Sequence, residues 1–475
     1  MSKSIDNILA DSGIAFGTSG ARGLVSQFTE EVCAAFSMAF LSVMQERGSV
    51  LQVALGMDRR PSSPEMAAAC AAAARAMKIE IIDYGILPTP ALALQAMRDG
   101  VPAIMITGSH IPFDRNGIKF YTPHGEITKA DEQQILAVSS ELPELGNICR
   151  GSESDIAHKH YVSRYTEWFK GRPLTGQRVG LYQHSAAGRD LNHEVLEALG
   201  AEVVVLGRSE QFVPVDTEAV SEPDRRQARL WTEEHCLDAL LTTDGDGDRP
   251  LLADERGEWL RGDILGLLCA RELGIQALAI PVSCNTAIEA CGVFDEVMRT
   301  RIGSPHVLAG MEALALRHDR VAGFEANGGF LLGGSIVKED RVLATLPTRD
   351  ALLPALTLMI AASLGAKQLS ALVADLPERY TASDRLKNFP AEKSHALIAS
   401  WTADPTAMQY ALAISSAVVE LDTTDGLRVV LENGDIFHLR PSGNAPELRC
   451  YVESDDAKKS ESMASALLES IEMQI

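Results

Sequence analysis

The sequence predicts an α/β protein in which three similar mixed α/β domains precede a smaller C-terminal α+β domain. Length supports several domains, because 475 residues are about three times the ~150 residues of a common domain. Strand and helix signals alternate in three successive stretches, as expected for parallel sheets with crossover helices. From about residue 369 onward, short strands replace this alternation. The three stretches share no clear sequence identity, so the prediction of repeated structure depends on the alternation alone.

The first stretch shows the clearest helix signals. One helix has Thr29 as its N-cap, carries acidic residues in its first turn, and ends before Gly48. The next begins at Ser63, where Pro64 takes an early helical position that proline tolerates. Buried apolar segments between these helices read as strands. The elements expected here are strands at 51–57, 79–84 and 103–107 and helices at 63–77 and 91–97.

The alternation resumes after a polar stretch at 146–154, which suggests a domain boundary. The later α/β stretches are expected to contain strands at 179–182, 203–206, 278–282 and 321–324 and helices at 191–199, 264–273, from about 304, and at 351–364. The last part is expected to contain strands at 427–431, 436–439 and 448–452 and helices after Ser394 and Ser454. The expected domains are therefore 1–154, 155–257, 258–368 and 369–475.

Composition and charge restrict the possible partners. With 46% hydrophobic and 23% charged residues, the chain is typical of a globular enzyme. The 43 basic and 65 acidic residues give a formal net charge of −22, so neither a nucleic acid nor an anionic membrane surface is an expected partner. An anionic ligand would need basic side chains concentrated at its own site.

Cysteine usage and apolar segments bear on the compartment. The 8 cysteines are scattered without a CxxC pair, which predicts a reduced, cytoplasmic protein. The N-terminus lacks the apolar run of a signal peptide. The longest apolar stretch, 351–366, is shorter than the ~20 residues of a membrane helix and contains Pro354. We therefore expect no membrane partner, while the sequence leaves monomer and dimer open.

The segment 107–119, TGSHIPFDRNGIK, is the first with chemistry-bearing residues. Ser109 follows the end of a predicted parallel strand, where open α/β sheets place their ligands. Asn116 and Gly117 form a turn signal that folds the chain back, so Lys119 can return close to Ser109. Taken alone, the same segment also fits a strand, a loop and a hairpin with an incidental serine and lysine.

The segment 244–249, DGDGDR, is the strongest metal signal. Asp244, Asp246 and Asp248 alternate with glycines that let the backbone curl, so their oxygens can converge on one hard cation. Mg²⁺ fits best, because it accepts a few carboxylates and a phosphate oxygen. An EF-hand ending at Glu255 fails, because Arg249 occupies its glycine position and the flanks look like strands. A solvated acidic turn is the remaining alternative, although three crowded carboxylates repel one another without a cation.

Two further segments place polar residues in glycine-rich turns. Glu325 and Asn327, in GFEANGG, alternate on one side after a strand and could hydrogen-bond sugar hydroxyls. Arg22, in FGTSGARG, brings positive charge to a run whose glycines permit close backbone approach. Each pattern alone is weak evidence, since a polar turn or an isolated glycine-rich run explains it as well.

The segment 440–446, RPSGNAP, lies between two strands of the last domain. Arg440 supplies a fork for phosphate, Ser442 a hydroxyl, Gly443 accessible backbone and Asn444 an amide. Together they could form an anion-binding cradle. A hairpin connection needs the same residue types, so this segment also has a purely structural interpretation.

In this order along the chain, FGTSGARG, TGSHIP with RNGIK, DGDGDR, FEANGG and RPSGNAP closely resemble the α-D-phosphohexomutase superfamily. The resemblance covers essentially the whole chain, and the order of five loops is far more specific than any one of them. It implies three domains of shared α/β topology and a fourth that closes over a central cleft. This agrees with the fold class expected from the alternation of elements.

The resemblance also implies roles for the residues. Ser109 matches a phosphoserine that donates its phosphoryl group, and its phosphate completes a Mg²⁺ site formed by the three aspartates. The matches for the remaining loops are Glu325 and Asn327 for sugar recognition, Arg440, Ser442, Gly443 and Asn444 for the non-reacting phosphate, and Arg22, His110, Lys119 and Arg249 for the transfer site. Lys119, its pKa depressed by neighbouring cations, is the candidate acid or base, with an electrostatic clamp as the alternative. His110 is a candidate for orienting the serine, or for a structural hydrogen bond.

The implied reaction moves a phosphoryl group between C6 and C1 of a hexose monophosphate through a hexose 1,6-bisphosphate. The loop variants look most like the phosphomannomutase branch, with phosphoglucomutase and phosphoglucosamine mutase as alternatives and a Mg²⁺-dependent sugar-phosphate phosphatase as one of another class. The chain departs from many members at Asn444-Ala445, where they carry Thr-Glu, and at Gly329, where they carry histidine. His306 is one candidate to replace that histidine, although an incidental surface histidine is the simpler interpretation.

Overall fold

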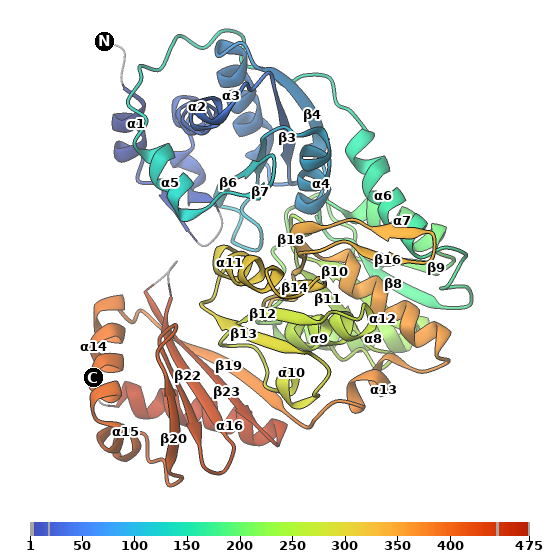
Figure 1. Ribbon diagram of the computed structural model, residues 1–475, viewed down its shortest axis with the longest axis vertical. Coiled ribbons are helices and arrows are strands. Elements are labelled where there is room, and N and C mark those ends of the chain that lie inside the picture. The colour runs from blue at the N-terminus through green and yellow to red at the C-terminus, as the bar shows by residue number, and fades with distance from the viewer. Residues whose placement is uncertain (1–3, 18–19, 443–445, 474–475) are drawn as a thin grey trace.

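The computed structural model describes residues 4–17, 20–442 and 446–473 (Figure 1). The N-terminal part, blue in Figure 1, is built on a seven-stranded sheet of order β1-β2-β6-β5-β3-β4, with β7 beside β6. Strands β3, β4 and β5 are parallel, and β6 returns antiparallel to β5. Its strands are β1 (Ala15–Phe16), β2 (Ala21–Leu24), β3 (Gln52–Met57), β4 (Glu80–Ile86), β5 (Ala103–Ile106), β6 (Arg115–Thr122) and β7 (Gly125–Glu126). Its helices are α1 (Ile5–Asp11), η1 (Val25–Gln27), α2 (Glu30–Arg47), α3 (Ser63–Ala76), α4 (Thr89–Asp99) and α5 (Lys129–Leu136).

The second sheet has four strands in the order β11-β10-β8-β9. Strands β8, β9 and β10 are parallel, and β11 is antiparallel to β10. This part comprises β8 (Arg178–Tyr182), β9 (Glu202–Leu206), β10 (Ala239–Thr243), β11 (Pro250–Ala253), α6 (Ile156–Trp168), α7 (Arg189–Ala198) and α8 (Glu222–His235). The acidic segment 244–249 is the turn between β10 and β11. Strands on both sides exclude an EF-hand, as expected.

The third sheet has the order β13-β12-β14-β15-β18, and a separate hairpin pairs β16 with β17. Its strands are β12 (Ala277–Pro281), β13 (Glu296–Thr300), β14 (Val321–Phe324), β15 (Phe330–Leu332), β16 (Ile336–Lys338), β17 (Arg341–Leu343) and β18 (Leu346–Asp350). Its helices are α9 (Gly262–Glu272), α10 (Ala287–Ala290), α11 (Ser304–Ala315), α12 (Leu352–Leu364) and α13 (Leu369–Ala374).

The three sheets repeat one topology. In each, a pair of parallel strands is followed by a third that lies beside the first, and an antiparallel strand then returns along the outer side of the third. The repetition confirms the predicted α/β class. It also places the turn after the third parallel strand of each sheet, carrying Ser109, the three aspartates or Glu325, at equivalent points of the fold. Such strand ends are where open α/β sheets bind ligands.

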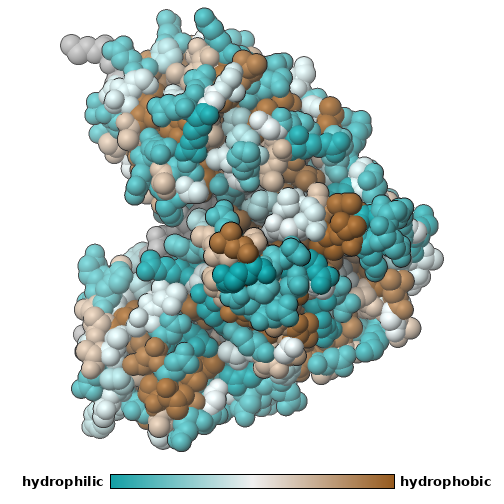
Figure 2. Space-filling model, in the orientation of Figure 1, coloured by the Kyte–Doolittle hydropathy of each residue, from teal (hydrophilic) through white to brown (hydrophobic). Residues whose placement is uncertain are grey.

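The C-terminal part, orange to red in Figure 1, is an antiparallel sheet of order β19-β23-β22-β21-β20. It has a hydrophobic core of its own, with residues such as Trp401, Phe437 and Cys450. The elements are β19 (Tyr380–Lys387), β20 (Val418–Asp422), β21 (Leu427–Leu431), β22 (Ile436–Pro441), β23 (Glu447–Ser454), α14 (Ala391–Ala403), α15 (Pro405–Ala411) and α16 (Ala457–Glu472). This part lies across from the N-terminal part, and Figure 2 shows a notch between these two lobes.

Capping and proline signals in the sequence predicted the boundaries of several helices. The Thr29 hydroxyl accepts a hydrogen bond from the Val32 N–H at 3.3 Å, as an N-cap should. The helix expected after Ser394 begins earlier, because Pro390 already sits in the N-cap position of α14. The elements that were not predicted are helices α1, α5, α6, α8, α10, α13 and α15 and strands β1, β2, β7, β13 and β15 to β20. Among the described residues, no helix is both long and apolar enough to cross a membrane. The four domain boundaries stay a prediction.

Candidate active site

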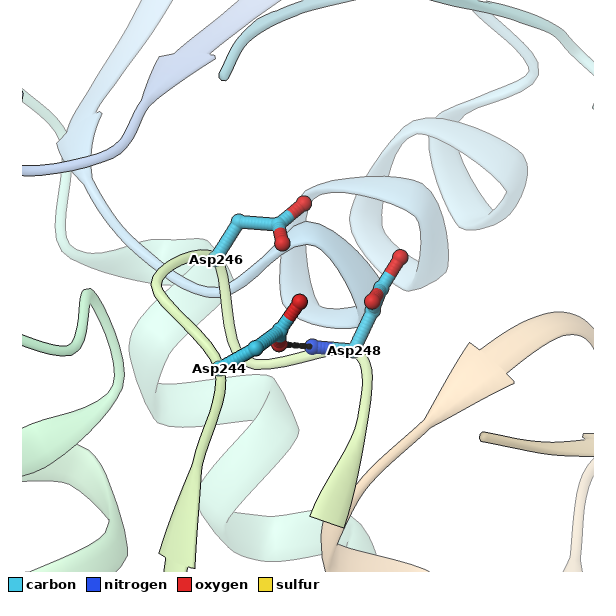
Figure 3. A group of neighbouring side chains, drawn as sticks. All are labelled: Asp244, Asp246 and Asp248. Carbon is cyan, nitrogen blue, oxygen red and sulfur yellow. Dashed lines mark hydrogen bonds between the residues drawn. The ribbon is translucent and has the colours of Figure 1, made fainter. Parts of the chain in front are cut away.

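The turn between β10 and β11 gathers three buried carboxylates. Oxygens of Asp244, Asp246 and Asp248 lie within 4.8 Å of one another, and Figure 3 shows the side chains converging from one turn. The Asp248 N–H donates to Asp244 Oδ1 at 3.2 Å and closes the turn. Gly247 takes a φ of +69°, a left-handed conformation that glycine adopts without strain. Three carboxylates in this arrangement could hold a metal ion.

The hydrogen bonding of the carboxylates fits a divalent cation. Asp246 Oδ1 and Asp248 Oδ1 are buried, and neither has a hydrogen-bond partner among the described residues. A buried carboxylate oxygen without a partner is costly, and a hard cation with oxygen ligands removes that cost. Burial together with Asp246 and Asp248 raises the pKa of Asp244 well above its usual range. A cation at this place would favour the ionised form.

Ser109 is positioned directly against this cluster. Its Oγ donates to Asp244 Oδ2 at 2.6 Å, and the side chain is fully buried. Its backbone has a φ of +56°, which is uncommon for a residue with a side chain, and its N–H donates to Thr107 Oγ1 at 2.8 Å. Strained backbone of this kind concentrates at functional sites.

Lys119 returns to the cluster on β6, as expected, but the predicted turn is misplaced. The chain reverses at Phe113 and Asp114, and Asn116 and Gly117 lie inside β6, where they pair with β2. Its Nζ donates to Asp246 Oδ2 and to Asp248 Oδ2, each at 2.7 Å. Burial by itself lowers the pKa of Lys119, but these two carboxylates outweigh burial and raise it. The expectation that neighbouring cations depress this pKa is therefore wrong for the structure, because the nearest charges are negative. The arrangement favours the electrostatic clamp.

His110 and Arg249 form a pair on the other side of Ser109. Arg249 Nη1 lies 2.7 Å from His110 Nδ1, and Ser109 Oγ lies 3.4 Å from the same nitrogen. Burial and the adjacent guanidinium lower the pKa of His110 to about 3, so the ring is neutral near pH 7 and accepts from Arg249. Burial, with Arg249 and Arg349 nearby, lowers the pKa of Arg22 to about 10, which leaves Arg22 charged at neutral pH.

A cavity of about 240 Å³ joins this centre to the C-terminal part. Its walls come from all three α/β parts and from the C-terminal part. Ser109, Lys119 and the three aspartates are buried and are not among its lining residues; they contact its wall through His110, Arg249 and Arg349. The charged and polar lining includes Arg22, His110, Asp216, Glu218, Arg249, Glu325, Asn327, Arg349, Asp384, Arg385, Arg440, Ser442 and Arg449. The arginines concentrate positive charge locally in a chain of net charge −22, as an anionic ligand would require. Gly443 and Asn444 lie outside the described residues.

Comparisons with known proteins agree with this architecture. Family models described as phosphoglucomutase/phosphomannomutase alpha/beta/alpha domain I, alpha/beta/alpha domain III and C-terminal domain match residues 13–144, 261–380 and 373–470. The chain belongs to the phosphoglucomutase/phosphomannomutase family. A phosphomannomutase of Salmonella muenchen is 51% identical over 99% of this chain and 98% of its own. A phosphomannomutase of Sinorhizobium fredii is 45% identical over 94% and 97%.

Solved structures share the fold. A phosphoglucomutase/phosphomannomutase family protein of Burkholderia thailandensis matches with a TM-score of 0.75 at 21% identity, covering 96% of this chain and 97% of its own. A putative phosphomannomutase of Thermus thermophilus matches with a TM-score of 0.73 at 21% identity, covering 97% and 99%. Both likenesses extend over nearly the whole of each chain, so the fold is shared over its full length.

The turn after β14, residues 325–329, is the one expected to recognise the sugar and is called the sugar loop below; short-range bonds hold it. Asn327 Oδ1 accepts from the Gly329 N–H at 3.1 Å, and Asn327 Nδ2 donates to Glu325 Oε2 at 3.3 Å. In the last sheet, Arg440 Nε donates to Asp425 Oδ1 at 3.0 Å, which orients the guanidinium at the cavity. His306 does not line this cavity. It lines a second one, between residues 124–129 and α11, so its role as a replacement for the family's histidine stays a prediction.

Arg349 is the most informative residue that sequence reasoning missed. From the end of β18 it donates to Asp248 Oδ2 through Nε at 3.1 Å and Nη2 at 3.0 Å, and its Nη1 lies 3.3 Å from Glu325 Oε1. It thus ties the acidic turn to the sugar loop. A Cβ at position 329 would lie 2.6 to 2.8 Å from the Arg349 side chain, so Gly329 makes room for it. The only local hint was a charged pair, Arg349 and Asp350, directly before the apolar stretch 351–366.

Proposed function

We propose that this enzyme is a phosphomannomutase that interconverts mannose 6-phosphate and mannose 1-phosphate through phosphorylated Ser109 and a mannose 1,6-bisphosphate intermediate. One observation carries the proposal: the Ser109 hydroxyl contacts the acidic turn, and the cavity that His110 and Arg249 line beside it is also lined by Arg440 and Ser442 of the C-terminal part. A nucleophile and a separate cationic group suit a substrate with one reacting and one spectator phosphate. Two relatives that match nearly the full chain carry the name phosphomannomutase.

The acidic turn is the proposed cofactor site. Asp244, Asp246 and Asp248 would bind Mg²⁺ together with an oxygen of the Ser109 phosphate. The Oδ1 atoms of Asp246 and Asp248 support this, because neither accepts a hydrogen bond among the described residues, although Arg249 Nε lies 3.6 Å from Asp248 Oδ1. When bound, Mg²⁺ would neutralise charge that develops on the phosphoryl oxygens. Lys119 would hold the second oxygens of two of these carboxylates, and Arg249 and Arg22 would face the phosphoryl group from the cavity side.

The proposed reaction has two transfers. The bond between Ser109 Oγ and phosphorus breaks as a hydroxyl oxygen of the hexose monophosphate bonds to phosphorus, and the hydroxyl proton passes to a nearby base. The resulting 1,6-bisphosphate turns end for end in the cavity. Ser109 Oγ then bonds to the phosphorus of the other phosphoryl group as the bond from that phosphorus to the sugar oxygen breaks, and the sugar oxygen takes the proton back from the base. The released monophosphate carries phosphate at the other position. A bisphosphate that escapes leaves Ser109 unphosphorylated, so added hexose 1,6-bisphosphate would act as an activator.

The cavity gives the spectator phosphate a proposed partner in both orientations. Arg440 and Ser442 line it, and Gly443 and Asn444 belong to the same loop. Glu325 and Asn327 would accept and donate hydrogen bonds to sugar hydroxyls. The four proposed domains, 1–154, 155–257, 258–368 and 369–475, would each contribute one loop: phosphoserine, metal, sugar and phosphate. A sugar-phosphate phosphatase would have no use for this second anion site.

The test uses purified protein with Mg²⁺ and mannose 6-phosphate, with and without catalytic mannose 1,6-bisphosphate, and measures mannose 1-phosphate and inorganic phosphate. We expect mannose 1-phosphate to accumulate faster with the bisphosphate present, and Ser109→Ala to abolish interconversion while substrate binding persists. The same assay with glucose 6-phosphate and with glucosamine 6-phosphate measures which hexose phosphate the enzyme prefers. Inorganic phosphate released at the rate of turnover, or a clear preference for another sugar, would reject the proposal.

A further inference from the structure

Arg60 lies behind the Ser109 loop and takes no part in the proposed chemistry. It follows β3 and is among the largest fully buried side chains of the described residues. Its guanidinium donates to the carbonyl oxygens of Ser109 (2.8 Å), Ile111 (2.6 Å), Pro112 (2.8 Å) and Arg115 (2.9 Å). Its Nε donates to Asp58 Oδ2 at 3.2 Å. One side chain therefore satisfies carbonyls along the whole turn from β5 to β6.

These bonds act on a backbone that would otherwise avoid its conformation. The left-handed backbone of Ser109 is unfavourable for a residue with a side chain and persists only where the surroundings impose it. The bond from Arg60 to the Ser109 carbonyl holds that peptide unit, while the Thr107 hydroxyl holds the Ser109 N–H. Because the peptide units before and after Ser109 are both held, its Oγ points at Asp244. Gly108 allows the approach, since a Cβ there would lie 2.7 to 2.9 Å from the Arg60 guanidinium.

A second part of the chain holds the guanidinium from its other face. Phe212, between β9 and α8, places its ring centroid 4.0 Å from Arg60 Cζ, a cation–π geometry. The same ring lies against the acidic turn, where a Cβ at Gly245 would be 3.1 Å from a ring carbon. Arg60 and Phe212 therefore connect the serine loop of the first sheet to the acidic turn of the second.

We propose that Arg60 is a positioning residue that imposes the conformation of the Ser109 loop, residues 107–115. We propose further that Phe212 aligns Arg60 with the acidic turn. The catalytic part of this inference depends on the proposed phosphoryl transfer. The conformational part does not. A planar fork with five N–H donors can bond four diverging carbonyls and a carboxylate at once, whereas an ammonium group has three donors at one point. Lysine at position 60 should keep the charge and lose the fork.

The experiment compares Arg60→Lys and the milder Phe212→Leu with a matched control, Arg75→Lys. Arg75 donates to the Cys149 carbonyl at the surface, so its substitution removes a similar bond far from the site. We expect Arg60→Lys to lower kcat about 100-fold, the order of loss caused by misplacing a reacting group by about 1 Å. KM should change less than about threefold, because Arg60 does not line the cavity. Phe212→Leu should also lower kcat with little change in KM, but by a smaller factor.

A measurement without turnover separates this inference from the proposed function. Hydrogen–deuterium exchange of the peptide covering residues 107–117 is followed in the four substrate-free proteins, wild type included. We expect exchange to be about tenfold faster in Arg60→Lys and unchanged in Arg75→Lys, with other peptides unaffected. The inference would be overturned if exchange of this peptide were unchanged in Arg60→Lys. It would also be overturned if Arg60→Lys and Phe212→Leu both lost kcat together with folding across the whole chain. Failure of the wild-type enzyme to convert any hexose phosphate would reject the proposed function only.

Discussion

Replacing Gly329 with alanine tests the packing that links the acidic turn to the sugar loop. The added Cβ would lie 2.6, 2.7 and 2.8 Å from Cδ, Cγ and Cβ of Arg349, well inside ordinary contact distance. Arg349 cannot withdraw freely, because its guanidinium is held by Asp248 and Glu325 inside the protein. Overpacking of this kind costs about 1–3 kcal/mol. We expect Gly329→Ala to destabilise the protein by that amount and to lower activity by displacing Arg349.

The assay is a double-mutant cycle in urea unfolding, with activity measured in parallel. It uses Gly329→Ala, Arg349→Ala, the double variant, and Gly146→Ala as a control with nothing within 4 Å of the added methyl group. Arg349→Ala is expected to be destabilising by itself, since it removes the guanidinium that pairs with both Asp248 and Glu325 inside the protein and leaves Lys119 and Arg249 to balance Asp248. In that background the extra methyl at 329 should cost almost nothing, while Gly146→Ala stays within about 0.5 kcal/mol of wild type. An equal cost of Gly329→Ala in both backgrounds would refute the steric argument.

Two more predictions concern the anion cradle and a buried histidine. Arg440→Ala should weaken the binding of mannose 6-phosphate and mannose 1-phosphate alike in calorimetry, because the cradle holds the spectator group; a defect confined to one isomer would contradict this role. Burial lowers the pKa of His184 to about 4, below the ~6.5 of an unfolded chain, so the unfolded state gains protons first as the pH falls. Wild type should therefore lose about 2 kcal/mol of stability from this group between pH 7 and pH 5, by urea unfolding, and His184→Gln should lack that part of the loss.

Several features of the candidate site could be predicted because they are local. The three aspartates alternate within six residues between two apolar strands, so their convergence follows from the turn itself. Ser109 follows a buried strand, and Lys119 comes back beside it on the next strand, where the register pairs Met105 with Lys119. The reversal was predicted at Asn116 and Gly117, but it occurs at Phe113 and Asp114, because Asn116 and Gly117 pair with β2. The family resemblance came from the same short motifs. The family models and relatives confirm it.

Other features depend on contacts between distant residues. The pKa of Lys119 was expected to fall, yet Asp246 and Asp248, more than 120 positions away, raise it. Arg349 lies 101 positions from Asp248, and no motif marks it as part of the site. His306 looked like a candidate from its neighbourhood in sequence, but α11 directs it to another cavity.

Sequence alone determined the alternation of elements, the helix caps, the polar turns and the family, because each of these depends on neighbouring residues or on short motifs. The tertiary structure alone decided which turns meet, which charges face one another, and how Arg60 and Arg349 support the turns. The physical reason is that a buried charge acquires its protonation state and its orientation from groups that folding brings within a few ångströms. Those groups come from separate sheets, and no pattern along the chain records their distances.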